Sequence, residues 1–253
     1  MLSLFAGSAV AQITFTSQVP IGISSSKDML FIDGNLQNEN TSNLVNNGKL
    51  YVTKNINNEQ ANIQVGTGTL YLKGTSEQTV SGSKTFNTYN LNTDNLNGIK
   101  LDANLTVSNF HHFLNGIIHT NANETYLIYK SNANYTGDDD KKHVKGTVKK
   151  YGAADFEFPV GNGNVERKAG LKNISEPSVF SCTYNESAPS SKAVHQLKAA
   201  SESESWNITQ SEKYNASANV ILSFNANKKS LPHNITDASL LKVGHLVNDK
   251  WNN

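Results

Sequence analysis

The chain has 253 residues with 22 basic and 21 acidic side chains, so its formal net charge is +1. No basic block alternates with aromatic residues, which argues against a nucleic-acid partner, because such a surface needs a basic stripe to release counterions. Hydrophobic residues make up only 37% of the chain, and its single cysteine excludes both an internal disulfide and a cysteine-based zinc cluster.

The N-terminal segment, residues 1–11, is apolar and ends in Ala9-Val10-Ala11. This ending has the small-x-small pattern of a signal-peptidase site. The segment is too short to cross a bilayer, which takes about 20 residues, and no other stretch is long and apolar enough to do so. We therefore predict that residues 1–11 are a signal peptide, truncated at its start because no basic region precedes it. The alternative is an ordinary buried strand.

Internal repetition is the main pattern between residues 29 and 150. A glycine turn followed by a short alternating apolar strand recurs in residues 33–36, 47–52, 68–72, 97–101 and 115–119. Gly48 follows Gly34 by 14 residues, Gly68 follows Gly48 by 20, and Gly116 follows Gly98 by 18. A spacing near 20 residues with one strand per repeat predicts a stacked β-solenoid.

Stacking would bury the apolar face of each strand, which a short strand cannot do alone. We expect Leu50, Leu70 and Ile99 to stack in the interior, with Thr69 and Tyr71 facing outward. Glycine supplies positive φ at the corners, asparagine tolerates it next best, and asparagine amides can stack between turns. A meandering β-sandwich remains the alternative for this region.

A charged turn at residues 137–142 ends the repeats, and the strand-like runs after it are longer and less regular. These runs predict a β-sandwich-like module. Cys182 lies in one of them, and we expect it to be a small buried hydrophobic residue. The predicted fold class is all-β, with a signal peptide (1–11), a parallel β-solenoid (12–140) and a β-sandwich-like module (141–253).

Several phrases in the second half recur together in one kind of surface protein. Residues 146–152 (GTVKKYG) are followed by residues 156–161 (FEFPVG), then by residues 206–208 (WNI) and 241–245 (LKVGH). In this order they resemble Bacteroidetes surface proteins exported through the type IX secretion system, in which β-helical repeats precede an FPVG-containing β-rich module. The resemblance covers most of the chain. It implies adhesion, surface display or scaffolding, and no catalytic residues.

These surface proteins usually end in a C-terminal sorting domain. The present sequence stops at Asn253 without one. We therefore expect either a fragment or a different export route.

Three histidines, His111, His112 and His119, lie close together in the sequence. Adjacent residues of a strand point to opposite faces, so His111 and His112 cannot easily share one ion. A metal site needs three or four ligands, and no further ligands stand at a suitable spacing. Asp138, Asp139 and Asp140 resemble a calcium-binding turn but lack the required spacing, so we predict a solvated turn and no metal or cofactor site.

Catalysis would require groups that the sequence does not present. Solenoid enzymes that cleave polysaccharides use paired carboxylates, whereas Asp33, Asp94 and Asp102 are scattered singly among turn residues. We therefore predict a secreted or cell-surface structural or adhesive protein that is not an enzyme. Its expected partners are other surface proteins, itself or surface glycans. A carbohydrate-binding or carbohydrate-active β-helix protein is the alternative.

Overall fold

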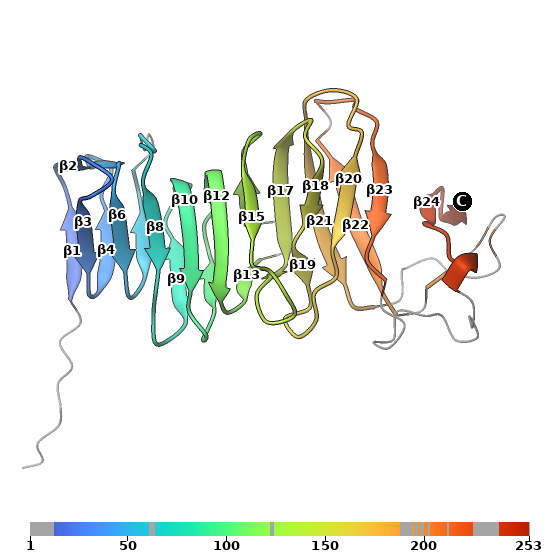
Figure 1. Ribbon diagram of the computed structural model, residues 1–253, viewed down its shortest axis with the longest axis horizontal. Helices are drawn as coiled ribbons and strands as arrows, with labels where there is room; N and C mark the ends of the chain where they lie inside the picture. The colour runs from blue at the N-terminus through green and yellow to red at the C-terminus, as the bar shows by residue number, and fades with distance from the viewer. Residues whose placement is uncertain are drawn as a thin grey trace, which may run out of the picture.

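The structure is a computed structural model that describes residues 13–60, 64–121, 124–187, 194, 197, 200–201, 203–211, 213–224 and 238–252. It is all-β, with 53% strand and 1% helix, and contains a parallel β-solenoid of about 6 turns over residues 14–150 (Figure 1). The expected fold class is therefore confirmed. The predicted signal peptide, residues 1–11, lies outside the described residues.

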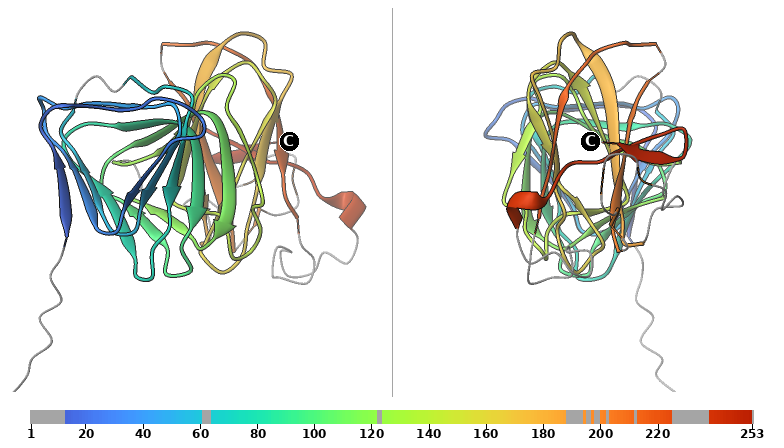
Figure 2. Two further views of the ribbon diagram at one scale, coloured as in Figure 1. Left: turned by 60° about the vertical axis from the view of Figure 1, so that its left-hand side comes forward. Right: turned by 90° about the vertical axis from the view of Figure 1, so that its right-hand side faces the viewer.

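The strands of successive solenoid turns line three faces, and Figure 2 shows the resulting three-sided cross-section. The first face is a continuous parallel sheet of eight strands. Its strands are β1 (Thr14–Ser17), β4 (Asn35–Asn38), β7 (Ile56–Asn58), β9 (Gln78–Ser81), β11 (Ile99–Leu101), β13 (Ile118–Thr120), β16 (Val144–Lys145) and β19 (Val160–Gly161).

The second and third faces are joined by two long strands, β10 (Phe86–Asp94) and β12 (Leu105–Asn115), which follow both faces in turn. The second face also contains β2 (Pro20–Ile23), β5 (Asn43–Asn46), β14 (Leu127–Tyr129) and β17 (Thr147–Gly152). The third face also contains β3 (Met29–Ile32), β6 (Lys49–Val52), β8 (Thr69–Leu72) and β15 (Asn134–Thr136).

Apolar side chains form columns along the interior. Leu50 pairs in register with Leu70, and Leu70 with Leu91, and all three are at most 1% exposed. The predicted stacking of Leu50 on Leu70 is confirmed, but the placement of Ile99 in this column was wrong. Ile99 lies on the first face between Gln78 and Ile118, because each turn carries several strands and successive glycine phrases therefore fall on different faces.

Two glycines show why the repeat needs this residue. Gly116 has a φ of 84°, the left-handed conformation expected at the corners. Gly68 does not, but a Cβ there would lie 2.5 Å from the carbonyl oxygen of Gly48 in the preceding turn. Glycine is therefore required at some repeat positions by positive φ and at others by the close approach of two backbones.

Buried asparagines connect neighbouring turns, as expected from the composition. The Asn38 Nδ2 donates to Asn58 Oδ1 at 3.3 Å, and both residues are fully buried. Asn58 in turn donates to the carbonyl oxygen of Thr85 at 3.1 Å. Such bonds satisfy backbone groups that leave the ladders at the corners.

Beyond the solenoid, the second and third faces continue as antiparallel sheets. On one side β17 pairs with β21 (Ser178–Asn185), which pairs with β22 (Ser205–Gln210). On the other, β18 (Phe156–Phe158) pairs with β20 (Ala169–Lys172), which pairs with β23 (Asn219–Leu222). Cys182 is buried within this region, as expected.

The antiparallel part shares its core with the solenoid. Phe158, Leu171 and Cys182 belong to the same buried cluster as Leu50 and Leu70. Parallel pairing continues on the first face to β19, so the change of strand direction comes after residue 161. A 3-10 helix η2 (Ala238–Leu240) and a hairpin of β24 (His245–Val247) and β25 (Lys250–Asn252) follow.

A buried lysine holds one corner of the last parallel turns. Lys150 is 3% exposed, and its Nζ donates to the carbonyl oxygens of Lys130 (2.9 Å), Ser131 (3.0 Å) and Ala133 (2.7 Å). An ammonium group has three donors, and all three are used here. Burial lowers the pKa of Lys150 to about 8. Its side chain therefore fastens the backbone between β14 and β15.

We expect the Lys150→Met substitution to destabilise the fold by about 1–3 kcal/mol, because the carbonyl oxygens of Ser131 and Ala133 lose the ammonium donor, whereas that of Lys130 keeps the Ala133 N–H. Urea denaturation measures the change in the free energy of unfolding. Lys172→Met, at an exposed position on β20, is the matched control and should change that free energy little. Equal losses in the two variants would contradict the role assigned to Lys150.

Candidate functional site: the open end of the solenoid

The first described turn leaves one end of the solenoid open (Figure 1). Within the described residues, no further strand pairs with the outer edges of β1, β2 and β3. Edge strands usually carry charges or proline, which discourage the addition of another strand. These three strands carry no charged residue, and Pro20 is their single proline.

Some interior columns lose part of their cover at this open end, among the residues that the structure describes, although Ile23 and Ile32 of the same strands stay buried. Leu30 is half-buried, although Leu50, on which it stacks, is 1% exposed. Ile21 is half-buried above Leu44, and Phe15 repeats the pattern on the first face. The open end therefore combines unpaired backbone groups with apolar side chains, which is the chemistry of strand addition.

An aromatic stack on the outer side of the third face ends at the same place. The ring centres of Tyr51 and Tyr71 are 4.1 Å apart with 10° between the planes, and Phe31 lies 5.9 Å beyond Tyr51. Because Tyr51 and Tyr71 stack face to face, each covers a face of the other. Phe31 is 56% exposed and neighbours Met29, which is 62% exposed. The stack therefore extends the apolar surface of the open end.

The structure separates the three histidines of the sequence analysis. His111 is fully buried, with Nδ1 2.8 Å from Tyr129 Oη and Nε2 3.0 Å from Thr93 Oγ1. His112 is exposed on the other side of the strand, as strand alternation predicted, and His119 lies half-buried on the first face. No group of three metal-ligating side chains occurs among the residues that the structure describes.

A fourth histidine, which the sequence analysis did not single out, is also buried. His143 is fully buried, its Nδ1 lies 3.0 Å from the Asp139 carbonyl oxygen, and its Nε2 accepts the Gly163 N–H at 2.9 Å. These partners require a neutral ring with its proton on Nδ1. Burial lowers the pKa of His143 and lowers that of His111 well below the ordinary value; Asp139 and Asp140 partly offset the effect at His143.

We expect the protein to lose stability as the pH falls below about 6.5, the ordinary histidine pKa. In that range the unfolded chain binds protons that the folded chain excludes from His111 and His143, so the free energy of unfolding falls with pH. Urea denaturation across this range measures the slope. His143→Gln should reduce it and His112→Gln, at an exposed position, should not. A slope that is the same in all three proteins would contradict this assignment.

The three aspartates at residues 138–140 serve separate partners. The Asp138 carboxylate lies 2.5 Å from Lys168 Nζ, and that of Asp139 lies 3.1 Å from Lys142 Nζ. The Asp140 carboxylate accepts the Glu166 N–H at 3.0 Å. The side chains therefore hold neighbouring loop residues.

A pair of carboxyl groups, which the sequence analysis missed, lies at the junction of the parallel and antiparallel strands. The side chains of Asp138 and Glu166 are 9% and 13% exposed. Burial, together with the adjacent Asp138, raises the pKa of Glu166 to about 9. The two residues belong to different loops, so no short motif in the sequence could have revealed the pair.

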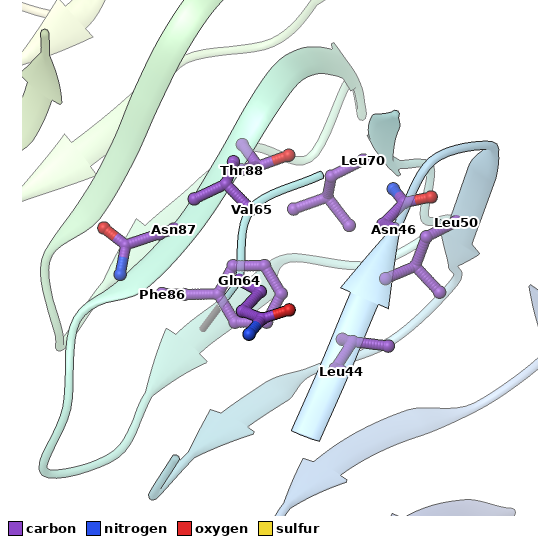
Figure 3. Close-up of a pocket in the computed structure, with 9 residues that line it drawn as sticks. All are labelled: Leu44, Asn46, Leu50, Gln64, Val65, Leu70, Phe86, Asn87 and Thr88. Atoms are coloured by element: carbon purple, nitrogen blue, oxygen red, sulfur yellow. The ribbon is translucent and has the colours of Figure 1, made fainter. Parts of the chain in front are cut away.

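A small hollow lies on the second face between β5 and the start of β10, where the described residues form no strand (Figure 3). It is lined by Leu44, Asn46, Leu50, Gln64, Val65, Leu70, Phe86, Asn87 and Thr88. Residues 61–63, which adjoin the lining residues Gln64 and Val65, are outside the described part of the chain, so we assign no ligand to this hollow.

Among the described residues, no helix has the length and apolar character needed to cross a membrane. The chain matches no protein-family model, no curated protein and no solved structure.

Proposed function

We propose that this protein is a secreted or cell-surface structural or adhesive module that acts by surface display, assembly or adhesion and performs no catalysis. The observation that carries the proposal is the open end of the solenoid, where, among the described residues, uncharged edge strands without an outer partner carry the half-buried side chains of Phe15, Ile21 and Leu30. An extended strand of a partner protein can add to such edges, because backbone hydrogen bonds supply affinity without special side chains.

The partners that fit this mode are other surface or extracellular proteins, including a second copy of the chain. Export through the type IX system, with a mature N-terminus at Gln12, is part of the proposal and rests on the sequence motifs. Mass spectrometry of the native N-terminus tests it. A mature protein that keeps residues 1–11 would contradict cleavage after Ala11.

The adhesive role is tested by placing charge on the open end. Leu30→Lys puts a cation at an uncovered apolar column, and we expect it to abolish self-association in sedimentation velocity or binding to cell surfaces. Ile221→Lys is the matched control, because Ile221 is an exposed apolar residue on β23, far from the open end (44% exposed). Equal binding by both variants and the unchanged protein would contradict a role for the open end.

Carbohydrate binding or cleavage is the second candidate, and the observation that favours it is the exposed aromatic stack. Its rings, however, cover one another's faces, which are the surfaces that a sugar ring would contact. Incubation with a broad glycan panel, with and without calcium, separates the two candidates. Cleavage that disappears when Asp138 or Glu166 is replaced would overturn the adhesive proposal, whereas surface binding without product supports it.

A further inference from the structure

We propose that Lys168 and Asp138 form an intramolecular amide bond between the lysine Nζ and the aspartate Cγ, with Glu166 transferring the protons. The proposal does not depend on the adhesive role. Asp138 lies in the loop between β15 and β16 of the solenoid, and Lys168 directly precedes β20 of the antiparallel sheets. The bond would join these two parts of the chain covalently.

The reacting groups are already in contact. Lys168 Nζ lies 2.5 Å from Asp138 Oδ2 and 3.9 Å from Glu166 Oε2. The Asp138 side chain is 9% exposed, so little water competes for its carboxyl group. This arrangement holds the nucleophile beside its target, and such proximity is worth many orders of magnitude in rate over separate reactants.

The two carboxyl groups are poised to share a proton. Apart from the ion pair with Lys168, no donor among the described residues serves Asp138 Oδ2, and none serves Glu166 Oε1. A proton shared between the two carboxyl groups would give these buried oxygens a hydrogen-bond partner. Burial first, and then the hydrogen bond and charge of Asp138, raise the pKa of Glu166 to about 9, so Glu166 carries that proton at neutral pH.

An aromatic ring lies beside the pair. The Tyr135 ring centre lies 5.8 Å from Lys168 Nζ, and Tyr135 donates its hydroxyl to the Glu157 carbonyl oxygen at 2.7 Å. Burial, and then the charges of Asp138 and Glu166, raise the pKa of Tyr135 well above its ordinary value. Burial alone would lower the pKa of Lys168, but the contact with Asp138 and the nearby carboxylate charges raise it, so the ammonium is the resting form. The neutral amine, which is the reactive form, arises when the proton passes to Asp138.

The step balances without any other reactant. The Lys168 ammonium gives a proton to the Asp138 carboxylate, and the neutral Nζ attacks Cγ to form a tetrahedral intermediate. Glu166 donates its proton to a hydroxyl of that intermediate, which leaves as water, and Glu166 regains a proton from the nitrogen. One C–N bond forms, one C–O bond breaks and one water molecule is released.

Intact-mass spectrometry of the denatured full chain tests the proposal. We expect a mass lower by one water molecule than that of the sequence from its measured N-terminus, and a branched proteolytic peptide that contains Asp138 and Lys168. Lys168→Arg, which keeps the positive charge, should have its full sequence mass. Glu166→Gln should stay unbonded when the unchanged protein has fully reacted, because a general acid contributes ~10²–10⁴-fold in rate.

Lys142→Arg is the matched control. Lys142 Nζ lies 3.1 Å from Asp139, but that carboxylate is 53% exposed, so this variant should keep the mass deficit. Circular dichroism shows whether each variant is folded. A folded, unchanged protein at its full sequence mass would overturn the proposal. A deficit that maps to residues other than Asp138 and Lys168, or one that persists in Lys168→Arg, would overturn it as well.

Discussion

Leu70→Asp should cost at least about 4 kcal/mol of folding free energy and leave the chain largely unfolded at room temperature. Leu70 is 0% exposed and stacks between Leu50 and Leu91 in the solenoid interior. A carboxylate at this position would have no cation and no water, and the neighbouring turns cannot move apart without breaking their ladders. Thermal and urea denaturation followed by circular dichroism measure the loss.

The residues on either side of Leu70 provide the controls, because they face outward on the same strand. Thr69→Asp should change the free energy of unfolding by less than about 1 kcal/mol, and Tyr71→Asp by about 1 kcal/mol, since it loses the stack with Tyr51. Equal tolerance of aspartate at all three positions would mean that these strands do not stack as described.

Arg167→Met should cost about 3–5 kcal/mol, because it leaves the buried Glu204 without its cation. The Arg167 Nε lies 3.1 Å from Glu204 Oε2, and both side chains are at most 7% exposed. The Tyr184 hydroxyl also donates to Glu204 Oε2, at 2.9 Å, but it cannot neutralise the charge. The contact ties the loop before β20 to the residue before β22.

The double variant Arg167→Met/Glu204→Gln should recover most of this loss. Glutamine still accepts the Tyr184 hydrogen bond but carries no charge, so the desolvation penalty disappears. Urea denaturation of the wild type, both single variants and the double variant gives the interaction energy. A double variant that is as unstable as Arg167→Met would show that packing, and not the unpaired charge, causes the loss.

The repeat could be recognised from the sequence because its causes are local. A glycine at Gly48 or Gly68 followed by alternating apolar residues specifies a turn and a strand, and a spacing of 20 residues places Leu70 on Leu50. The face to which a strand belongs depends on how many strands precede it within the turn. The same local phrase therefore could not place Ile99, which lies on another face.

The junction could not be predicted for a related reason. Asp138, Glu166 and Lys168 meet because two loops pack where strand direction changes, and their contacts depend on the three-dimensional path of both loops. The sequence suggested instead that residues 137–142 were a solvated boundary turn. Buried His143 escaped notice because its partners are backbone groups of Asp139 and Gly163, which leave no side-chain pattern.

The uncovered first turn sets the order in which the molecule comes apart. A solenoid turn is stabilised by its nearest neighbours. The turn formed by β1, β2 and β3 has one described neighbouring turn, whereas the turns that contain Leu50 and Leu70 each have two. The free energy of local opening should therefore be lowest in this turn and rise along the axis toward the antiparallel sheets. Amide hydrogen exchange should be fastest in β1–β3 and slow progressively along the solenoid axis. The protein would then unfold locally from this end before it unfolds globally.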